Sequence, residues 1–161
     1  MTPAEFSARI LAPAAAAFPF HDAPASRALL LAIAGQESGW TDRLQEPTPF
    51  ARGFWQMERG GGVLGVMEHP ASREIIATFC ESLEIPPDLD PVYEAIAWND
   101  TLAYAFARLL LWTDPAPLPA AGDVAGSLAV YRRLWRPGRP DDTRWTTRYA
   151  EALAVSAPAV A

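Results

Sequence analysis

The sequence predicts a single all-α domain, residues 1–161, organised around one central buried helix. Between Ala28 and Ala34 every residue is apolar, so a helix there has no polar face and must be surrounded by protein. No segment alternates apolar and polar residues for long enough to predict a β-strand. The length of 161 residues, with 50% hydrophobic and 20% charged residues, fits one domain with one core.

Capping residues mark where the first two helices start. The Thr-Pro-Ala-Glu sequence at positions 2–5 is a capping box with proline at the first helical position, so a helix should begin there. Pro13 is expected to kink or end it. Asp22 or Ser26 is then predicted to cap the central buried helix, because both side chains can accept hydrogen bonds from free backbone N–H groups.

One carboxyl group lies at the end of the central helix. Glu37 occupies the last turn, and Gly39 should stop the helix after Ser38 because glycine readily adopts the left-handed conformation. The negative end of the helix dipole disfavours the charged carboxylate there, and an apolar wall would do the same. Three aromatic residues are candidates for that wall: Trp40, Phe54 and Trp55. A Glu that keeps its proton near neutral pH suits general acid catalysis, although many glutamates at helix ends are simply solvated.

Further helices are predicted between residues 69 and 112. One starts at the His-Pro pair at 69–70 and ends at the Pro-Pro pair at 86–87. Its inward stripe is Ile75, Ile76, Phe79 and Leu83, and Cys80 beside it should pack in the core. Another starts at Asp90, breaks near Asn99 and resumes as a second, mostly buried helix up to Trp112.

In the C-terminal part, the sequence predicts two more helices after a stiff proline-rich connector at 114–119. The first runs over 128–135 and stops at the Pro-Gly pair at 137–138, and the last is capped by Asp141 or Asp142. One face of this last helix carries Trp145, Tyr149 and Leu153.

Arginines interleaved with tryptophans make the C-terminal part locally basic, and three interpretations are open. The arginines are Arg132, Arg133, Arg136, Arg139, Arg144 and Arg148, and the tryptophans are Trp135 and Trp145. Stacking of bases on such residues is typical of single-stranded nucleic-acid binders, but the acidic residues among them favour an ion-paired surface. One or two arginines would alternatively meet carboxylates of a ligand. The net charge of −6 argues against general nucleic-acid binding.

No metal or cofactor site is predicted. His21, His69 and Cys80 lie too far apart in sequence to read as a zinc site. The glycines at 60–62 lack the Gly-Lys-Ser/Thr ending of a phosphate-binding loop, so they predict a turn or a close approach to a ligand.

The first 25 residues resemble a signal peptide only weakly. Residues 10–20 are mostly apolar and an Ala-Pro-Ala sequence follows at 23–25, but Glu5, Pro13 and Pro19 do not suit a leader. We therefore expect this stretch to belong to the fold and the protein to be made in the cytoplasm. No apolar run is long enough for a membrane span.

A second segment, residues 51–56, follows the Glu-Ser pair at 37–38. Together they resemble the soluble lytic transglycosylase and goose-type lysozyme group, in which a helix-ending Glu-Ser precedes a Gly-Ala-x-Gly-Leu-Met-Gln-like segment. Ala51, Gly53 and Gln56 match this segment, Phe54 and Trp55 replace its two apolar residues, and Phe50 stands where glycine is usual. Of a third motif, Ala-Tyr-Asn-x-Gly, only Tyr131 within residues 129–133 is retained. The Trp-Arg-Pro-Gly segment at 135–138 resembles small phage proteins.

The resemblance implies a lysozyme-like fold that binds peptidoglycan glycan strands. It implies cleavage between N-acetylmuramic acid and N-acetylglucosamine by a lytic transglycosylase in which Glu37 is the single catalytic acid. Residues expected on the substrate-binding side are Ser38, Gly53, Phe54, Trp55, Gln56 and Tyr131. Ser38 would orient Glu37 or the substrate, or merely cap backbone groups. Because the signal-peptide pattern is weak, the protein would reach the cell wall by another route or as a component of a phage virion.

Two alternatives stay open. A hydrolysing lysozyme needs a second carboxylate, for which Asp42, Glu46 and Glu58 are the nearest candidates in sequence. A non-enzymatic phage structural or assembly protein on the same scaffold is favoured by the degraded third motif and the acidic net charge. The sequence leaves the oligomeric state open.

Overall fold

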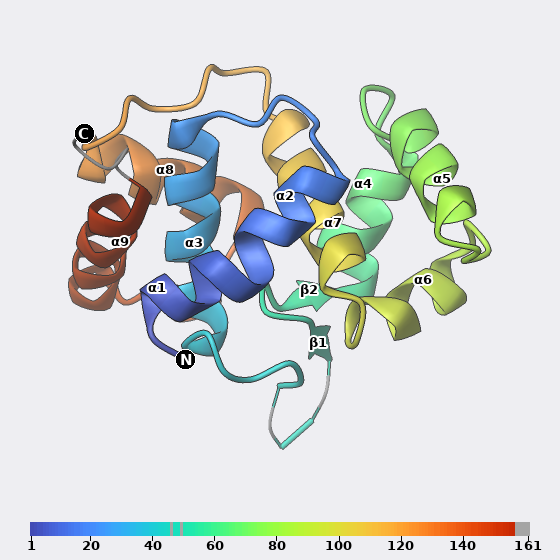
Figure 1. Cartoon of the computed structure of the whole chain (residues 1–161), viewed down its shortest axis with the longest axis horizontal. Coiled ribbons are helices and arrows are strands. Elements are labelled where there is room, and N and C mark those ends of the chain that lie inside the picture. Colours follow the sequence, from blue (N-terminus) through green and yellow to red (C-terminus); the bar gives the residue numbers. More distant parts are fainter. Residues whose placement is uncertain (46, 49, 157–161) are drawn as a thin grey trace.

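Helices make up most of the structure, a computed structural model that describes residues 1–45, 47–48 and 50–156. The predicted all-α class is confirmed. The helices are α1 (Pro3–Phe6), the π-helical η1 (Ser7–Leu11), α2 (Ala12–Ala17), α3 (Pro24–Ser38), η2 (Arg59–Val63), α4 (Leu64–Glu68), α5 (Arg73–Ser82), α6 (Leu89–Ile96), α7 (Asp100–Trp112), α8 (Val124–Trp135) and α9 (Asp142–Ser156). In Figure 1, α8 and α9 lie at one end of the longest axis and α4, α5 and α6 at the other, with α2, α3 and α7 between them.

Two helices, α3 and α7, are buried along most of their length. In α3, residues Leu29 to Ala34 are each at most 1% exposed, as their uniform apolar character predicts. In α7, residues Leu102 to Leu109 are at most 4% exposed. Helix α3 packs most extensively on α9 and also contacts α1, η1 and α7. The core therefore joins the N-terminal, middle and C-terminal parts of the chain.

The ends of α3 differ in how well the sequence predicts them. Gly39 adopts a left-handed conformation (φ 60°), and its N–H donates to the carbonyl of Gly35, so the predicted stop is confirmed. The predicted cap by Asp22 or Ser26 is wrong, because Ala23 is the N-cap residue. Ser26 lies in the first turn, where its Oγ accepts from the N–H of Ala23 at 3.1 Å.

The first helix begins at the predicted capping box and passes through Pro13. Thr2 Oγ1 accepts from the N–H of Glu5, and the Glu5 carboxylate accepts from the N–H of Thr2. Pro13 does not end the helix. Residues Ser7–Leu11 instead form a π-helical turn, in which the N–H of Ala12 donates to the carbonyl of Ser7, five residues back. A wider turn accommodates the missing N–H of proline.

Several predicted helix starts are displaced. His69 lies at the end of α4 and not at the start of α5, which begins at Arg73. Helix α6 begins at Leu89, and α8 begins at Val124, four residues before the predicted Leu128, because Asp123 Oδ1 accepts from the N–H of Gly126. The predicted break at Asn99 is confirmed by its Oδ1, which caps α7. Asp141 Oδ1 likewise accepts from the N–H of Arg144 and caps α9.

The described residues contain two short strands that the sequence did not predict. Strands β1 (Ala51–Arg52) and β2 (Met57–Glu58) pair antiparallel, with Ala51 opposite Glu58. Gly53 (φ 71°) begins the connecting turn, and Gln56 closes it by donating its N–H to the carbonyl of Gly53. A strand of two residues is too short to show an alternating pattern.

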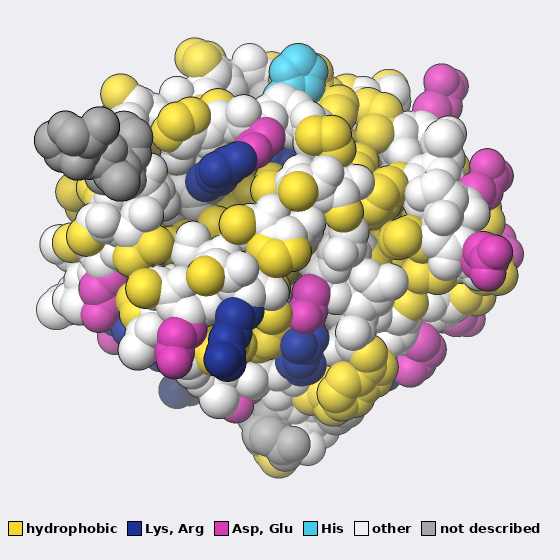
Figure 2. All heavy atoms as spheres, in the orientation of Figure 1, with side chains coloured by type: hydrophobic (Ala, Val, Ile, Leu, Met, Phe, Trp, Pro, Cys, Tyr) yellow, Lys and Arg dark blue, Asp and Glu magenta, His cyan; other side chains and the backbone are white. Residues whose placement is uncertain are grey.

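On the face shown in Figure 2, apolar side chains are scattered among arginines and acidic residues, several of which lie next to each other. Within the described ranges, no helix has the length and apolar character needed to cross a membrane.

Candidate functional site

A cleft of about 1080 Å³ opens beside the C-terminal end of α3. Its lining comes from segments far apart in sequence: the last turn of α3, the β-hairpin, η2, α4, the end of α8 and the segment that leads into α9. Glu37, Gln56 and Tyr131 all line this cleft, as the motif resemblance predicts. The fold thus brings together three residues from separate elements.

Glu37 is half-buried in the cleft wall. The Tyr131 hydroxyl donates a hydrogen bond to Glu37 Oε1 at 2.5 Å. Burial raises the pKa of Glu37 above its ordinary value, and the negative charge of Glu58 adds to this effect. The Tyr131 hydrogen bond and the positive charge of Arg144 oppose it, but the pKa stays raised. Glu37 therefore keeps its proton to a higher pH than an exposed glutamate does.

Tyr131 holds the Glu37 carboxyl group from a rigid support. Its side chain is 2% exposed, and its ring stacks on Trp145 with centroids 4.6 Å apart. Trp145 is anchored in turn, because its Nε1 donates to Ser127 Oγ at 3.2 Å. Burial and the Glu37 carboxylate raise the pKa of Tyr131, so the phenol remains a donor.

Gln36 and Arg144 complete the polar surroundings of Glu37, and the sequence did not single out either as a site residue. Arg144 projects from the first turn of α9 and donates to the carbonyl of Gly35 at 3.4 Å. Gln36 Nε2 donates to the carbonyl of Asp141 at 3.3 Å, whereas its buried Oε1 has no partner among the described residues. Gln36 itself lines the cleft.

Gln56 is held in place by its own turn. Its backbone has a left-handed conformation (φ 47°), and its Nε2 donates to the carbonyl of Gly53 at 2.9 Å. Gln56 also lines the cleft.

The cleft lining does not include Ser38, Gly53, Phe54 or Trp55. Ser38 Oγ donates to the carbonyl of Ala34 within α3. Phe54 and Trp55 are 1% and 0% exposed, and Trp55 Nε1 donates to the carbonyl of Leu30. We therefore reassign these four residues from substrate contact to packing and backbone geometry. Apolar residues in a motif do not by themselves distinguish a ligand-facing wall from a core.

Trp135 is the tryptophan that lines the cleft. Its Nε1 donates to the carbonyl of Trp55 at 2.8 Å, which ties α8 to the hairpin. The predicted wall residue Trp40 is buried elsewhere: its Nε1 donates to the carbonyl of Leu31, and Arg148 lies over its ring. A tryptophan near the acid in sequence is thus replaced by one from a distant element.

The C-terminal arginines divide into two sets. Arg132, Arg133 and Arg148 form ion pairs with Asp142, Asp114 and Glu151, as the ion-paired interpretation predicts. Arg136, Arg139 and Arg144 line the cleft. The second set adds positive charge to a cleft that several carboxylates also line.

Four carboxylates besides Glu37 line the cleft: Asp42, Glu58, Glu68 and Asp141. Glu58 is the one whose charge contributes to the raised pKa of Glu37. Glu46, another predicted candidate, lies outside the described residues. Within the described ranges no three His, Cys, Asp or Glu residues are grouped to hold a metal ion. Cys80 is buried, which raises its pKa to about 11.

Comparison with known proteins finds no family model, curated protein or solved structure that matches this chain. The resemblance described above therefore rests on the motif residues themselves.

Proposed function

We propose that this protein cleaves the β-1,4 bond between N-acetylmuramic acid and N-acetylglucosamine in peptidoglycan, with Glu37 as general acid. One observation carries the proposal. A glutamate with a raised pKa lies in the wall of a large open cleft, and a buried tyrosine fixes its carboxyl group there. This is the arrangement that a glycosidic oxygen needs in order to receive a proton as its bond to carbon breaks.

The reaction proposed is that of a lytic transglycosylase. Glu37 donates its proton to the leaving oxygen while the bond between that oxygen and C1 of the muramic residue breaks. The Glu37 carboxylate then accepts the proton from the 6-hydroxyl of the muramic residue. At the same time the 6-oxygen bonds to C1 of that residue. The product is a 1,6-anhydro-muramic end, and Glu37 is protonated again. No water is consumed.

Other groups in the cleft suit a glycan. Trp135 offers an aromatic surface on which a sugar ring can pack, and the polar residues Gln36 and Gln56 also line the cleft. Arg136, Arg139 and Arg144 can meet the carboxylates of the peptide stems on the glycan. A cleft of about 1080 Å³ has room for more than one sugar ring.

Loss of turbidity of purified peptidoglycan tests the proposal. The native protein should clear the suspension, and Glu37→Gln should reduce the rate by a factor on the order of 100 or more, because a general acid contributes that much. Glu81→Gln is the matched control, since Glu81 is exposed and does not line the cleft. A native protein that leaves the suspension turbid would favour the non-enzymatic scaffold, a structural or assembly protein of a phage.

Hydrolysis is the second candidate, and Glu58 is the observation that favours it. A lysozyme that hydrolyses uses a second carboxylate as base or nucleophile. Glu58 projects from β2 into the cleft, and its charge raises the pKa of Glu37, so the two carboxyl groups are close enough to interact. If hydrolysis operates, Glu58→Gln should abolish activity as Glu37→Gln does. The transglycosylase proposal expects Glu58→Gln to retain most of it.

A further inference from the structure

A second cavity of about 740 Å³ lies outside the cleft, between the link from α2 to α3, the end of α7 and the connector that follows α7. Its lining includes His21, Asp22, Arg108, Trp112, Asp114 and Leu118. None of these residues lines the cleft around Glu37. The proposed glycan cleavage therefore gives this cavity no role.

A buried arginine that has no ion pair among the described residues lies in the wall of this cavity. Arg108 is 4% exposed, its Nη2 donates to the carbonyl of His21 at 2.9 Å, and its guanidinium lies 5.7 Å from the centre of the Phe20 ring. Its Nε is buried and has no partner within the described chain. No carboxylate of the described residues forms an ion pair with it. Burial lowers the pKa of Arg108, as expected for a charge removed from water.

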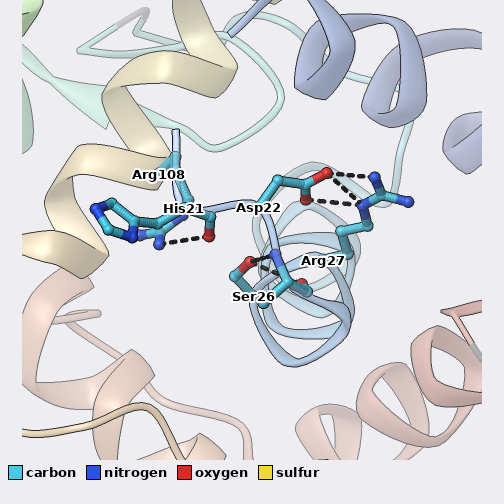
Figure 3. Close-up of polar contacts among 6 residues, drawn as sticks. His21, Asp22, Ser26, Arg27 and Arg108 are labelled. Carbon is cyan, nitrogen blue, oxygen red and sulfur yellow. Dashed lines mark hydrogen bonds and ion pairs between the residues drawn. The ribbon is translucent and has the colours of Figure 1, made fainter. Parts of the chain in front are cut away.

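The two carboxylates nearest to the cavity are already paired with other arginines. Figure 3 shows Asp22 turned toward Arg27, whereas Arg108 is directed at the backbone carbonyl of His21. Asp22 accepts from Arg27 Nε at 2.7 Å and also from its Nη2. Asp114 pairs with Arg133 and accepts from the N–H of Ala116. Because each of these pairs is neutral, Arg108 is the charged side chain of the cavity wall that has no ion pair among the described residues.

No neighbouring phenolate supplies the missing negative charge. The hydroxyl of Tyr104, whose electrostatic neighbours are Asp22, Arg27 and Arg108, is buried without a hydrogen-bond partner in the described structure. Burial raises the pKa of Tyr104 to about 12, so its hydroxyl stays neutral. A buried guanidinium normally has a carboxylate or phosphate partner, because its desolvation is otherwise not compensated.

The rest of the cavity wall is flat and apolar. The imidazole of His21 stacks on the indole of Trp112, with centroids 4.5 Å apart and planes 13° from parallel. Trp112 is 40% exposed, which is unusual for so large an apolar side chain. Pro115, Pro117 and Leu118 continue the apolar wall.

We infer that this cavity binds a small organic monocarboxylate, whose carboxylate pairs with Arg108 and whose apolar body packs against Trp112 and Leu118. A single negative charge matches the one unpaired charge of Arg108. A dianion such as phosphate carries one charge more than Arg108 can match. The apolar wall also favours a ligand with a hydrocarbon part over a small hydrated ion.

NMR titration of the full chain with benzoate tests this inference. Benzamide is the matched neutral control, and inorganic phosphate at the same ionic strength is the dianion control. We expect benzoate to shift the Arg108 Nε–H and Trp112 Nε1–H signals in a saturable manner, whereas benzamide should leave the Arg108 signal in place. Phosphate should bind more weakly than benzoate. No saturable shift with benzoate, an equal effect of benzamide, or tighter binding of phosphate would each overturn the inference.

Variants separate the charge from the apolar wall. Arg108→Met should weaken benzoate binding by about tenfold or more, as expected for the loss of a charge-assisted contact. Arg9→Met is the matched control because Arg9 is exposed and lines neither cavity, and it should leave benzoate binding unchanged. If Arg108→Met does not fold, Trp112→Ala provides the test. Benzoate binding should then fall several-fold, and unchanged binding would contradict the proposed site.

Discussion

At the scale of single residues, the protonation of Glu37 links the stability of the protein to its chemistry. Burial raises the pKa of this carboxyl group in the folded state above its value in the unfolded chain. The folded state therefore binds more protons between these two pKa values, and stability falls as the pH rises through that window. The same property supplies the proton for the proposed cleavage.

Glu37→Gln should remove this pH dependence. Below the ordinary pKa of glutamate, about 4.3, the native carboxyl group is neutral in both states, and the variant should be about as stable as the native protein. As the pH rises, the variant should become the more stable of the two, because it has no buried carboxyl group to ionise. Urea unfolding at several pH values from about 4 to about 8 measures the difference. A variant that loses stability relative to the native protein as the pH rises would refute the assigned shift.

Tyr131→Phe should shift the protonation equilibrium of Glu37 toward the protonated form. The Tyr131 hydroxyl lowers the pKa of Glu37 by donating to its carboxylate, so removing the hydroxyl should raise that pKa further. The descending limb of the pH profile of kcat/KM should therefore shift to higher pH, at a stability cost of about 1 kcal/mol for the lost hydrogen bond. A ¹³C NMR titration of the Glu37 carboxyl group checks the shift directly. A limb that moves to lower pH would contradict the role given to Tyr131.

Residue-level prediction succeeds where a chemical requirement is local. Glu37 could be identified because the helix end and the stop at Gly39 are encoded within a few neighbouring residues. Arg144 and Trp135 could not, because their position in the cleft with Glu37 depends on how α9 packs on α3 and how α8 packs on α9. The motif resemblance places Phe54 and Trp55 on the substrate side, and only the tertiary structure shows that both are buried.

At the scale of elements, the β-hairpin positions Gln56 and Glu58, and it depends on Gly53. The positive φ of Gly53 (71°) is strained for other residues, and a Cβ there would lie 2.8 Å from the carbonyl oxygen of Ile96. The hairpin can therefore lie close to α6 only with glycine at this position.

Gly53→Ala should destabilise the protein by about 2 kcal/mol or more, since left-handed strain and a backbone clash add together. Gly60→Ala is the matched control, because a Cβ at Gly60 meets nothing within 4 Å. It should change stability by less than about 1 kcal/mol. Chemical denaturation of both variants measures the contrast. Equal effects of the two substitutions would show that the close approach at Gly53 does not restrict the hairpin.

The boundaries that the sequence predicts correctly depend on a local signal, either a glycine such as Gly39 or a capping side chain that acts on its own helix. Asn99 and Asp141 accept from backbone groups three residues ahead, so their role is visible in sequence. His69 resembles a helix start because proline follows it, yet the chain turns at 70–72 before α5 begins. In this turn the buried Ser72 Oγ donates to the carbonyl of Val66, which belongs to α4. The contact therefore exists only when α4 is formed. Boundaries that rest on such tertiary contacts are not encoded locally.

At the scale of the whole molecule, the buried helices α3 and α7 belong to one hydrophobic core that includes residues from Phe6 to Ala152. Because both ends of the chain contribute to this core, thermal unfolding should occur in a single cooperative transition. Calorimetry should give equal calorimetric and van't Hoff enthalpies. Two resolved transitions would show that the α4–α6 end unfolds independently of the α8–α9 end.

The central claim is that Glu37 donates a proton to a glycosidic bond in the cleft. Mass spectrometry of the fragments released from purified peptidoglycan tests it most directly, because it identifies both the bond and the reaction. The native protein should release muropeptides with 1,6-anhydro-muramic ends, and Glu37→Gln should release almost none. Reducing ends that are one water heavier would assign the same acid to hydrolysis. If the native protein releases no fragments, or if Glu37→Gln releases as many as the native protein, Glu37 is not the acid of a glycan-cleaving enzyme.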